Sequence, residues 1–280
     1  MPVQSSFANT SCAVHASELG RANTSWSLDC VEEEAVAFRY NGFPHGVMMA
    51  TPADLEDFAV GFSLAEGVIA AASDVDAMSV AATAEGISVD ISLRGESLRR
   101  YLAGRRVRQL RGHTSCGLCG VEDLRDVRNL PARVHPAVLP EEAAISRAFD
   151  RLREWQPLSR LTRGAHAAAW VDVDGAIRIV REDVGRHNAL DKLIGAGLRG
   201  AFSHTRGFCL VTSRCSFEMV QKAVAADFAV IVSASAPTAL AIRTAKAAGL
   251  ALCALSRDRA PLIFTQHEHS EDSSWQPNAS

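Results

Sequence analysis

Two cysteines separated by two residues lie in the sequence Ser115-Cys116-Gly117-Leu118-Cys119-Gly120. Thiolates at this spacing can bind a metal ion, exchange a disulfide or carry a sulfur atom. The flanking glycines permit backbone conformations that side chains forbid, and they let a reaction partner approach the sulfur atoms closely. The pattern therefore predicts an exposed loop that presents Cys116 and Cys119 for chemistry.

The segment before this cysteine pair is strongly basic. Between residues 94 and 111, seven arginines accompany a single acidic residue, Glu96. Positive potential stabilises a thiolate, and it attracts phosphate groups or acidic protein surfaces. A solvated basic linker would have the same composition, so the sequence leaves a functional and a purely structural interpretation of these arginines open.

Three kinds of site compete for the cysteine pair. His113 completes a His-x-x-Cys-x-x-Cys pattern, but structural zinc sites usually combine two cysteine pairs and no second pair exists. A thioredoxin-type redox switch would place the pair at the start of a helix after a strand, whereas Gly120 and the preceding segment indicate a loop. A thiolate that carries sulfur as a persulfide, with the second cysteine resolving it by exchange, suits the glycine-flanked loop best.

Composition excludes several other classes of protein. The 280 residues are 48% hydrophobic, so a wholly disordered chain is excluded, and the formal net charge of -3 argues against a surface that grips nucleic acid. The apolar stretch 236–255 is interrupted by Arg243 and Lys246, which argues against a membrane span. Seven cysteines are too few for a disulfide scaffold. We expect a cytoplasmic protein with mostly reduced thiols.

Sequence texture predicts four segments. Residues 1–28 are expected to be a disordered leader, and residues 29–130 an N-terminal α+β domain that carries the CGLCG loop. Residues 131–265 are expected to form a three-layer α/β domain with a mostly parallel core, and residues 266–280 a flexible tail. Residues 94–140, rich in Arg, Gly and Pro, are expected to be linker-like.

The turn dipeptide Asn41-Gly42 predicts a hairpin between strands at 36–40 and 47–49, and Thr51-Pro52 is expected to open a helix. A second pair of strands is expected around 78–80 and 87–93. The larger domain is predicted to begin with a helix at 141–155 and a strand pair that flanks Asp174-Gly175. Its remaining strands are expected at 208–211, 229–232 and 250–255, with helices from about His187, Ser216 and Pro237.

With these motifs in place, the chain resembles a known family, the formate dehydrogenase accessory sulfurtransferases (FdhD). The resemblance extends from about Glu32 to Thr265 and depends on an ordered set of motifs rather than on one. Besides CGLCG the set comprises 40–42, 47–52, 54–59, 61–67, 162–170, 182–192 and 213–222.

The resemblance implies a sulfurtransferase. Such proteins accept sulfur from a cysteine desulfurase as a persulfide, bind the Mo-bis(molybdopterin guanine dinucleotide) cofactor and place sulfur on its molybdenum for formate dehydrogenase. Cys116 matches the persulfide carrier and Cys119 its companion. The resemblance also implies a cytidine-deaminase-like fold for residues 131–265 and a homodimer, with no intrinsic metal. Neither nucleic acid nor a membrane is an expected partner.

The family's nucleotide-contacting stretch matches residues 254–259 here, although the glycine usual within it is missing. By this match the cofactor-binding residues are Ala254, Leu255, Ser256, Arg257, Asp258 and Arg259. Three strand-to-helix junctions could line the same crevice, since open α/β sheets bind ligands beyond the carboxyl ends of their strands. They contribute Gly185, Arg186 and His187, then Ser213 and Arg214, then residues 233–237. Ordinary helix capping would explain each junction equally well, and His166 and His187 could equally be core histidines. GDP is the expected fragment ligand.

Functions of other classes are weaker. Zinc deaminases need His-x-Glu followed by Pro-Cys-x-x-Cys, and here the cysteine pair lies upstream of His166, which is followed by two alanines. A rhodanese-like loop at 209–214 has suitable spacing but the sequence of a strand. A cofactor-binding chaperone without sulfur transfer would explain the crevice and the arginines, yet it would leave CGLCG without a purpose.

Overall fold

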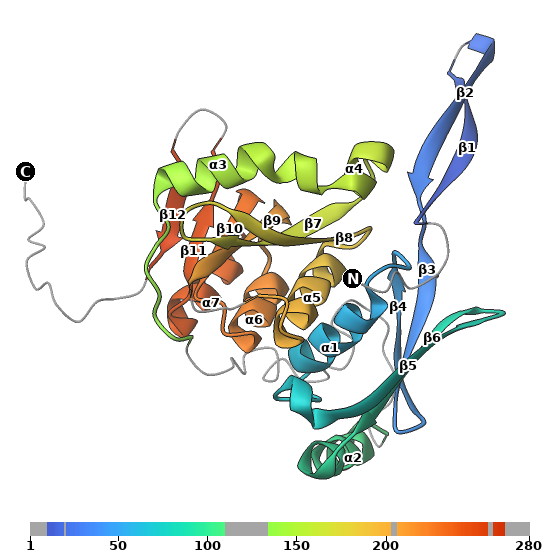
Figure 1. Ribbon diagram of the computed structural model, residues 1–280, viewed down its shortest axis with the longest axis vertical. Coiled ribbons are helices and arrows are strands. Elements are labelled where there is room, and N and C mark those ends of the chain that lie inside the picture. Colours follow the sequence, from blue (N-terminus) through green and yellow to red (C-terminus); the bar gives the residue numbers. More distant parts are fainter. Residues whose placement is uncertain (1–9, 20, 110–133, 203–205, 257–259, 267–280) are drawn as a thin grey trace, which may run out of the picture.

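The computed structural model describes the chain except for residues 1–9, 20, 110–133, 203–205, 257–259 and 267–280. Its strands form a two-stranded ribbon, a four-stranded sheet and a six-stranded sheet, with helices between and around the two larger sheets (Figure 1). The fold is therefore mixed α/β, as the sequence predicted. In this part of the chain no helix is long and apolar enough to cross a membrane.

The ribbon consists of β1 (Ser11–Glu18) and β2 (Arg21–Val31), which pair antiparallel and project from the body (Figure 1). We call residues 11–31 the arm. The prediction of a disordered leader over residues 1–28 is wrong from Ser11 onward, and residues 1–9 lie outside the described part. The segment is rich in Ser, Thr and Asn, but Trp26, Leu28 and Cys30 alternate with polar residues, which is the period of a strand.

The four-stranded sheet has the order β4-β3-β6-β5. Its strands are β3 (Glu34–Tyr40), β4 (Phe43–Ala50), β5 (Val75–Thr83) and β6 (Gly86–Leu93). The predicted turn at Asn41-Gly42 is confirmed: both residues have positive φ, 48° and 80°, which is the conformation of a tight hairpin turn. The second predicted strand pair, β5 with β6, is confirmed as well.

Two helices accompany this sheet. The predicted helix after Thr51-Pro52 is α1 (Leu55–Ala65), and it is buried along most of its length. The prediction of a linker from residue 94 is wrong in its first part, because residues Gly95–Gln109 form α2. Straight-chain arginines are good helix formers, and Arg99 pairs with Glu96 one turn earlier at 3.2 Å. Helix α2 ends just before the segment 110–133, which contains CGLCG and lies outside the described residues.

The six-stranded sheet has the order β12-β11-β10-β9-β7-β8. Its strands are β7 (His166–Asp172), β8 (Ile177–Asp183), β9 (Gly207–Arg214), β10 (Val230–Ser235), β11 (Ala251–Ala254) and β12 (Leu262–Thr265). Its helices are α3 (Glu142–Leu152), α4 (Pro157–Thr162), α5 (Arg186–Leu198), α6 (Phe217–Ala225) and α7 (Ala239–Ala248). Short 3-10 turns lie at Ala72–Asp74 and Arg153–Trp155.

Strand direction in this sheet departs from the prediction of a mostly parallel core. Strands β9, β10 and β11 are parallel neighbours, as expected. However, β7 runs antiparallel to both β8 and β9, and β12 is an antiparallel edge strand. The turn Asp174-Gly175 makes β7 and β8 a hairpin, so β8 runs in the same direction as β9 while β7 separates them. The core is thus parallel only over three adjacent strands.

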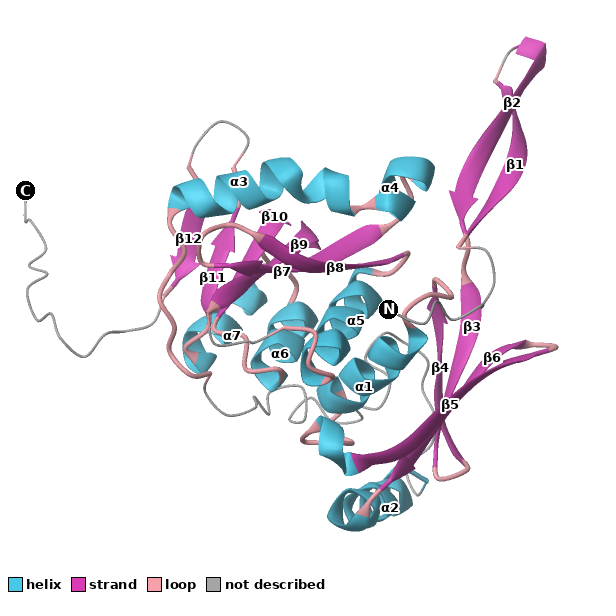
Figure 2. Ribbon diagram, in the orientation of Figure 1, coloured by secondary structure: helices cyan, strands magenta, loops and turns pink. Residues whose placement is uncertain are grey.

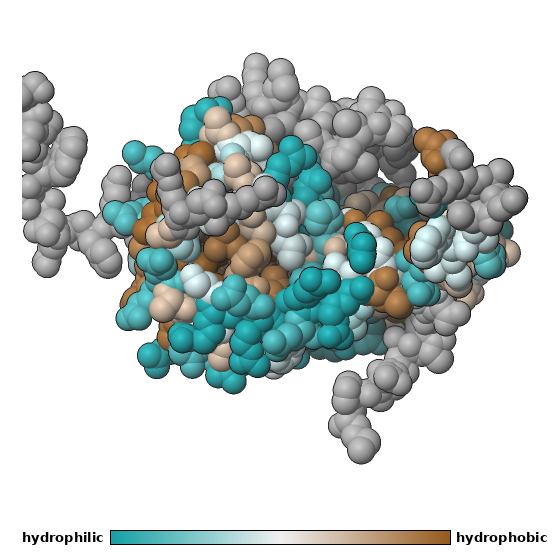
Figure 3. Space-filling view, turned by 90° about the horizontal axis from the view of Figure 1, so that it is seen from above, coloured by the Kyte–Doolittle hydropathy of each residue, from teal (hydrophilic) through white to brown (hydrophobic). Residues whose placement is uncertain are grey.

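Helices cover both faces of the six-stranded sheet, giving three layers (Figure 2). Helices α3 and α4 lie on one face, while α5, α6 and α7 lie on the other and α1 packs against α5. The α3 face encloses a smaller hydrophobic cluster, whereas the other cluster runs from the four-stranded sheet through α1 and α5 to the six-stranded sheet. Because this second cluster is continuous, the two sheets share a core. Seen from above, the described surface has a band of hydrophilic residues along the lower edge of the view, and hydrophobic areas lie above this band (Figure 3).

Candidate functional site

The strand-to-helix junctions named in the sequence analysis lie along one edge of the six-stranded sheet. Strands β8, β9, β10 and β11 all run toward this edge, so Gly185, Ser213-Arg214 and Ala254 follow or end their respective strands there. Strand register places Arg214 opposite Ser235 and Ala254 opposite Ser233. We call this the carboxyl edge. It brings together the described residues of all three predicted junctions.

Several predicted site residues lie outside the described part of the chain. These are Cys116 and Cys119 of the CGLCG segment and Arg257, Asp258 and Arg259 of the nucleotide-contacting stretch. Of that stretch the structure describes Ala254, which is buried, and Leu255 and Ser256, which are partly buried. The Leu255 amide donates to the Ser233 carbonyl, which holds the start of the stretch against β10.

The first turn of α5 carries a cluster of basic groups at the carboxyl edge. Gly185 is the N-cap residue, no side chain caps the helix, and Arg186 and His187 follow. The Arg186 Nε is buried and has no hydrogen-bond partner among the described residues. His166, opposite Asp183 in the β7–β8 pairing, is half-buried. Burial, reinforced by the charges of Arg186 and His187, lowers the pKa of His166. Such a cluster is suited to an anionic group.

His187 connects this cluster to the next junction. Its Nε2 lies 2.7 Å from a carboxylate oxygen of Glu218 in the first turn of α6, and 3.5 Å from the Ser216 hydroxyl. The hydrogen bond with His187 lowers the pKa of Glu218, against the opposing effect of burial. The Nε2 atom of His187 is therefore already paired with Glu218, and this pair links the N-termini of α5 and α6.

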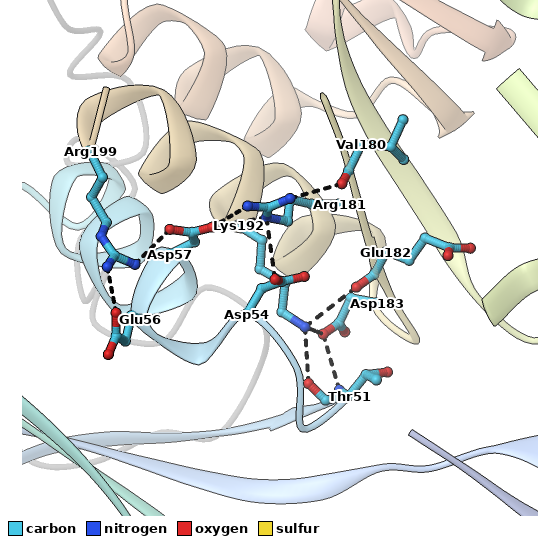
Figure 4. Close-up of polar contacts among 10 residues, drawn as sticks. All are labelled: Thr51, Asp54, Glu56, Asp57, Val180, Arg181, Glu182, Asp183, Lys192 and Arg199. Carbon is cyan, nitrogen blue, oxygen red and sulfur yellow. Dashed lines mark hydrogen bonds and ion pairs between the residues drawn. The ribbon is translucent and has the colours of Figure 1, made fainter. Parts of the chain in front are cut away.

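Beneath the carboxyl edge lies a buried ion pair. The Lys192 Nζ and an Asp183 carboxylate oxygen are 2.6 Å apart, and both side chains are fully buried (Figure 4). Both groups also bond to Thr51: Lys192 donates to its carbonyl at 2.9 Å, and Asp183 accepts from its amide at 3.0 Å. Asp183 accepts two further hydrogen bonds, from the Gly185 amide and the Asn188 side chain. The turn that precedes α1 is thereby held against the junction between β8 and α5.

A second polar cluster crosses from α1 to α5 and β8 (Figure 4). Asp57 of α1 accepts from Arg181 at 2.7 Å and from Arg199 at 2.8 Å, and Arg199 also pairs with Glu56. Close helix packing makes these contacts possible. A Cβ added at Gly61 would lie 1.8 Å from the Asp191 carbonyl oxygen, and one added at Gly195 would lie 1.8 Å from the Asp57 carbonyl oxygen. We call the α1–α5 contact, together with these ion pairs and the buried Lys192–Asp183 pair, the junction.

Three described cysteines are poor nucleophiles. Cys209, Cys215 and Cys253 are buried in or beside the central strands. Burial raises the pKa of Cys215 to about 12 and that of Cys253 to about 11, and it raises the pKa of Cys209 as well. Cys215 precedes α6, where a helix N-terminus could have lowered its pKa, but desolvation outweighs that effect. These thiols are unsuited to carrying sulfur.

No group of three or more His, Cys, Asp or Glu side chains suited to a metal ion occurs in the described ranges. A hollow of about 320 Å³ lies between the root of the arm, the turn before α1, the end of β8 and α4. It is lined by Thr10, Ala53, Asp54, Trp155, Pro157, Leu158, Leu161, Val180 and Glu182.

Sequence reasoning missed how the motifs converge. Glu218 belongs to the motif 213–222 and Lys192 to the motif 182–192, yet neither was singled out. The two motifs meet through His187 and Glu218, and the motif 182–192 meets Thr51 through Lys192 and Asp183. The available signals were the charged residues Lys192, within an apolar helical pattern, and Asp183, at the end of a strand pattern. Such residues are rarely buried unless they are paired, so together they indicate a buried ion pair.

The fold and this edge define a mixed α/β protein with a polar, partly basic edge beside a closely packed pair of helices. A family model described as "FdhD/NarQ family" matches residues 31–271. A protein of Xanthomonas euvesicatoria pv. vesicatoria named "Sulfur carrier protein FdhD" is 46% identical over 233 residues, which are 83% of this chain and 82% of that protein. A protein of the same name from Cupriavidus necator is 46% identical over 247 residues, covering 86% and 85%. The chain therefore belongs to the FdhD/NarQ family.

A solved structure supports the fold. The crystal structure of a protein from Desulfotalea psychrophila, described as a formate dehydrogenase accessory protein, matches with a TM-score of 0.71. It covers 93% of this chain and 99% of that one at 23% identity. At this identity the likeness concerns the fold alone.

Proposed function

We propose that this protein is a sulfur carrier that receives persulfide sulfur from a cysteine desulfurase on Cys116. It transfers this sulfur to Mo-bis(molybdopterin guanine dinucleotide), which is then used to activate formate dehydrogenase. Membership of a family whose members carry the name "Sulfur carrier protein FdhD" supports the sulfur-carrier role. The link to formate dehydrogenase is supported by the resemblance of the ordered motifs, CGLCG among them, to those of the formate dehydrogenase accessory sulfurtransferases.

The observation that carries the proposal is the contrast between the three buried thiols of the core and the cysteine pair of the CGLCG segment. Cys209, Cys215 and Cys253 are buried, with raised pKa values that leave little thiolate near neutral pH. Cys116 and Cys119 are instead each followed by a glycine, and in the sequence they come after a basic helix. Positive charge on α2 would favour a thiolate in the residues that follow it.

The proposed loading step is a thiol exchange. The Cys116 thiolate attacks the outer sulfur of the desulfurase persulfide, the S–S bond breaks, and the desulfurase cysteine leaves as a thiolate. Cys116 then holds the persulfide. Cys119 stands close enough in sequence to accept a hydrogen bond from it or to displace the sulfur by a second exchange.

The carboxyl edge is the proposed site for the guanylyl and phosphate groups of the substrate cofactor. The orphaned Arg186 Nε and the uncapped first turn of α5 fit a phosphate, because both offer donors that no described acceptor satisfies. Ser213 and Arg214 lie at the next strand-to-helix junction, and Ala254, Leu255 and Ser256 lie at and after the end of β11. The sequence match adds Arg257, Asp258 and Arg259, which lie outside the described residues. When bound, the cofactor supplies the molybdenum that accepts the sulfur.

Intact-mass spectrometry after incubation with a cysteine desulfurase and cysteine tests the carrier. The parent protein should gain one sulfur atom, and Cys116→Ala should gain none. Cys30→Ala, which removes an exposed thiol of the arm, is the matched control and should load like the parent. Normal loading of Cys116→Ala would refute the assignment, whereas GDP binding without any loading of the parent would favour a cofactor-binding chaperone.

Calorimetry with GDP and CMP tests the ligand site. GDP should bind as a fragment of the cofactor and CMP poorly. Arg259→Ala should weaken GDP binding by about tenfold to more than a hundredfold, since a charge-assisted hydrogen bond contributes about 1.5–3 kcal/mol. Arg178→Ala is the control, because this exposed arginine near the start of β8 pairs with Asp172 at the end of β7, at the opposite end of these strands from the carboxyl edge. Absence of GDP binding by the parent would remove the cofactor from the proposal.

The proposal extends to organisation. We infer that residues 131–265 form a cytidine-deaminase-like domain, that residues 29–130 form the smaller domain with the CGLCG loop, and that the protein acts as a homodimer in the cytoplasm. Light scattering coupled to gel filtration tests the dimer directly: a mass of one chain at working concentration would refute it.

A further inference from the structure

The arm carries two cysteines that are far apart in sequence and directly opposite in structure. Cys12 of β1 pairs with Cys30 of β2 in the antiparallel register, and both are exposed. Two pairs nearer the body, beyond Ser11 and Val31, the Glu32 amide donates to the Thr10 carbonyl at 2.8 Å. Since hydrogen-bonded pairs recur at every second residue, Cys12 and Cys30 form a hydrogen-bonded pair too, for which a Cα separation of about 5.5 Å is usual. That separation is within the range that a disulfide spans.

Directly opposite residues of a ribbon point to the same face. The face that holds the two cysteines also holds Val14, Trp26 and Leu28, whose exposed fractions are 37%, 58% and 51%. The opposite face holds mainly serines, with His15 and Asp29. In Figure 1 the arm extends away from the body. Because Cys12 and Cys30 are both exposed, their thiols are open to a reagent of low molecular weight.

The neighbourhood of the pair suits disulfide exchange better than metal binding. Glu32 lies on the same face as Cys12. However, the two thiols and Glu32 are not arranged to hold a metal ion, since no group of three or more such ligands occurs in the described ranges. The hydrogen bond with Glu32 raises the pKa of Cys12. We therefore expect the Cys30 thiolate to attack first and Cys12 to resolve the intermediate.

We propose that Cys12 and Cys30 are a redox-active dithiol that closes to a cross-strand disulfide by exchange with a low-molecular-weight disulfide, such as oxidised glutathione. Cys30 loses its proton and attacks one sulfur of this oxidant, whose S–S bond breaks to release one thiol. Cys12 then loses its proton and displaces the second thiol. Two protein thiols are oxidised and the oxidant is reduced to two thiols.

Closing this bond would fasten the two strands where the arm joins the body. The adjacent Val31 packs against Gly164 after α4, so the root of the arm already contacts the larger sheet region. A ribbon of two strands is marginally stable by itself, because it has no core of its own. A disulfide at its root would hold the strands in register and slow their separation.

The test uses the full-length protein, treated with oxidised glutathione and then analysed by differential alkylation, peptide mapping and hydrogen exchange. Peptide mapping should find Cys12 linked to Cys30, and arm amides should exchange about tenfold or more slowly than after reduction. In Cys12→Ser, Cys30 should carry one glutathione instead. The matched control Cys12→Ser with Val14→Cys keeps two thiols on the same face but moves one to a diagonal position, where the wider separation should prevent closure.

A Cys12–Cys30 link found in the parent and absent from the shifted control would support the dithiol. Separate glutathione adducts on both cysteines, unreacted thiols, or a link to Cys116 or Cys119 would overturn it. Equal linkage in the shifted control would overturn it as well. Sulfur loading on Cys116 is measured separately, so either proposal can fail without the other.

Discussion

The junction and the arm are both built from polar contacts, but they differ in what surrounds those contacts. At the junction, Lys192 and Asp183 are fully buried and α1 approaches α5 so closely that two glycines meet backbone oxygens. In the arm, even the apolar residues Trp26 and Leu28 are half exposed, and backbone pairing provides most of the contacts. Close packing therefore fixes how α1 and α5 lie against each other. The two strands of the arm are held mainly by their backbone pairing.

The difference shows which region of the fold fixes the positions of its side chains. The junction holds the start of α5, and thus Gly185 and Arg186, at a set position beside β8. A buried charge without its partner is costly, so each group there maintains the position of the others. The arm has no comparable constraint, which suits a segment regulated by a covalent bond.

The largest effect is expected from Lys192→Met. This change leaves the buried Asp183 carboxylate without its counter-charge, and loss of one partner of a buried ion pair usually costs about 3–5 kcal/mol. Urea denaturation followed by circular dichroism measures the free energy of unfolding. Arg178→Met, which removes an exposed ion pair with Asp172, should cost less than about 1 kcal/mol. Equal losses in both variants would mean that the junction is no more constrained than the surface.

Gly61→Ala should follow, with a loss of about 3 kcal/mol in the free energy of unfolding. The added methyl group would lie 1.8 Å from the Asp191 carbonyl oxygen, so α1 must move away from α5. The matched control is Gly104→Ala in the exposed part of α2, where no atom lies within 4 Å. That change should stabilise the protein by up to about 1 kcal/mol, because alanine favours a helix. A neutral Gly61→Ala would contradict the close packing of the junction.

A smaller, pH-dependent effect is expected from His187→Gln. The pKa of Glu218 is lowered from its ordinary value of 4.5 by its contact with His187. The stabilisation from this carboxylate is therefore present above pH 4.5 and is lost as the pH falls through the lowered pKa. The parent should exceed the variant by about 1 kcal/mol near pH 5.5 and lose this advantage in stronger acid. Thermal unfolding across this range measures the difference, and a gap that grows on acidification would contradict the assigned contact.

The smallest effect is expected from Trp26→Ser in the arm. Its side chain is 58% exposed, so the free energy of unfolding should change by no more than about 0.5 kcal/mol. Chemical denaturation of the parent and the variant gives this difference. A loss as large as that of Gly61→Ala would mean that the apolar face of the arm is covered in the folded protein.

Much of the fold could be predicted from the sequence because the signals are local. Asn41-Gly42 adopts positive φ in a tight turn, and Pro52 with the apolar spacing that follows it marks α1. Alternating strand and helix patterns placed β9, α6, β10, α7 and β11 in order. The arm and α2 were missed, because composition rich in Ser or Arg was given more weight than alternation and helix propensity.

By itself, the sequence determined the motifs: the glycine-flanked pair of Cys116 and Cys119, the strand-to-helix junctions and the order of the elements. Only the tertiary structure decided which motifs meet. Arg181 reaches Asp57 and Cys12 faces Cys30 through strand register and helix packing, which join positions with no local signal in common. Burial was decided there too. Cys215 precedes a helix N-terminus, which can lower the pKa of a thiol, yet the surrounding core excludes water from its sulfur and raises its pKa to about 12.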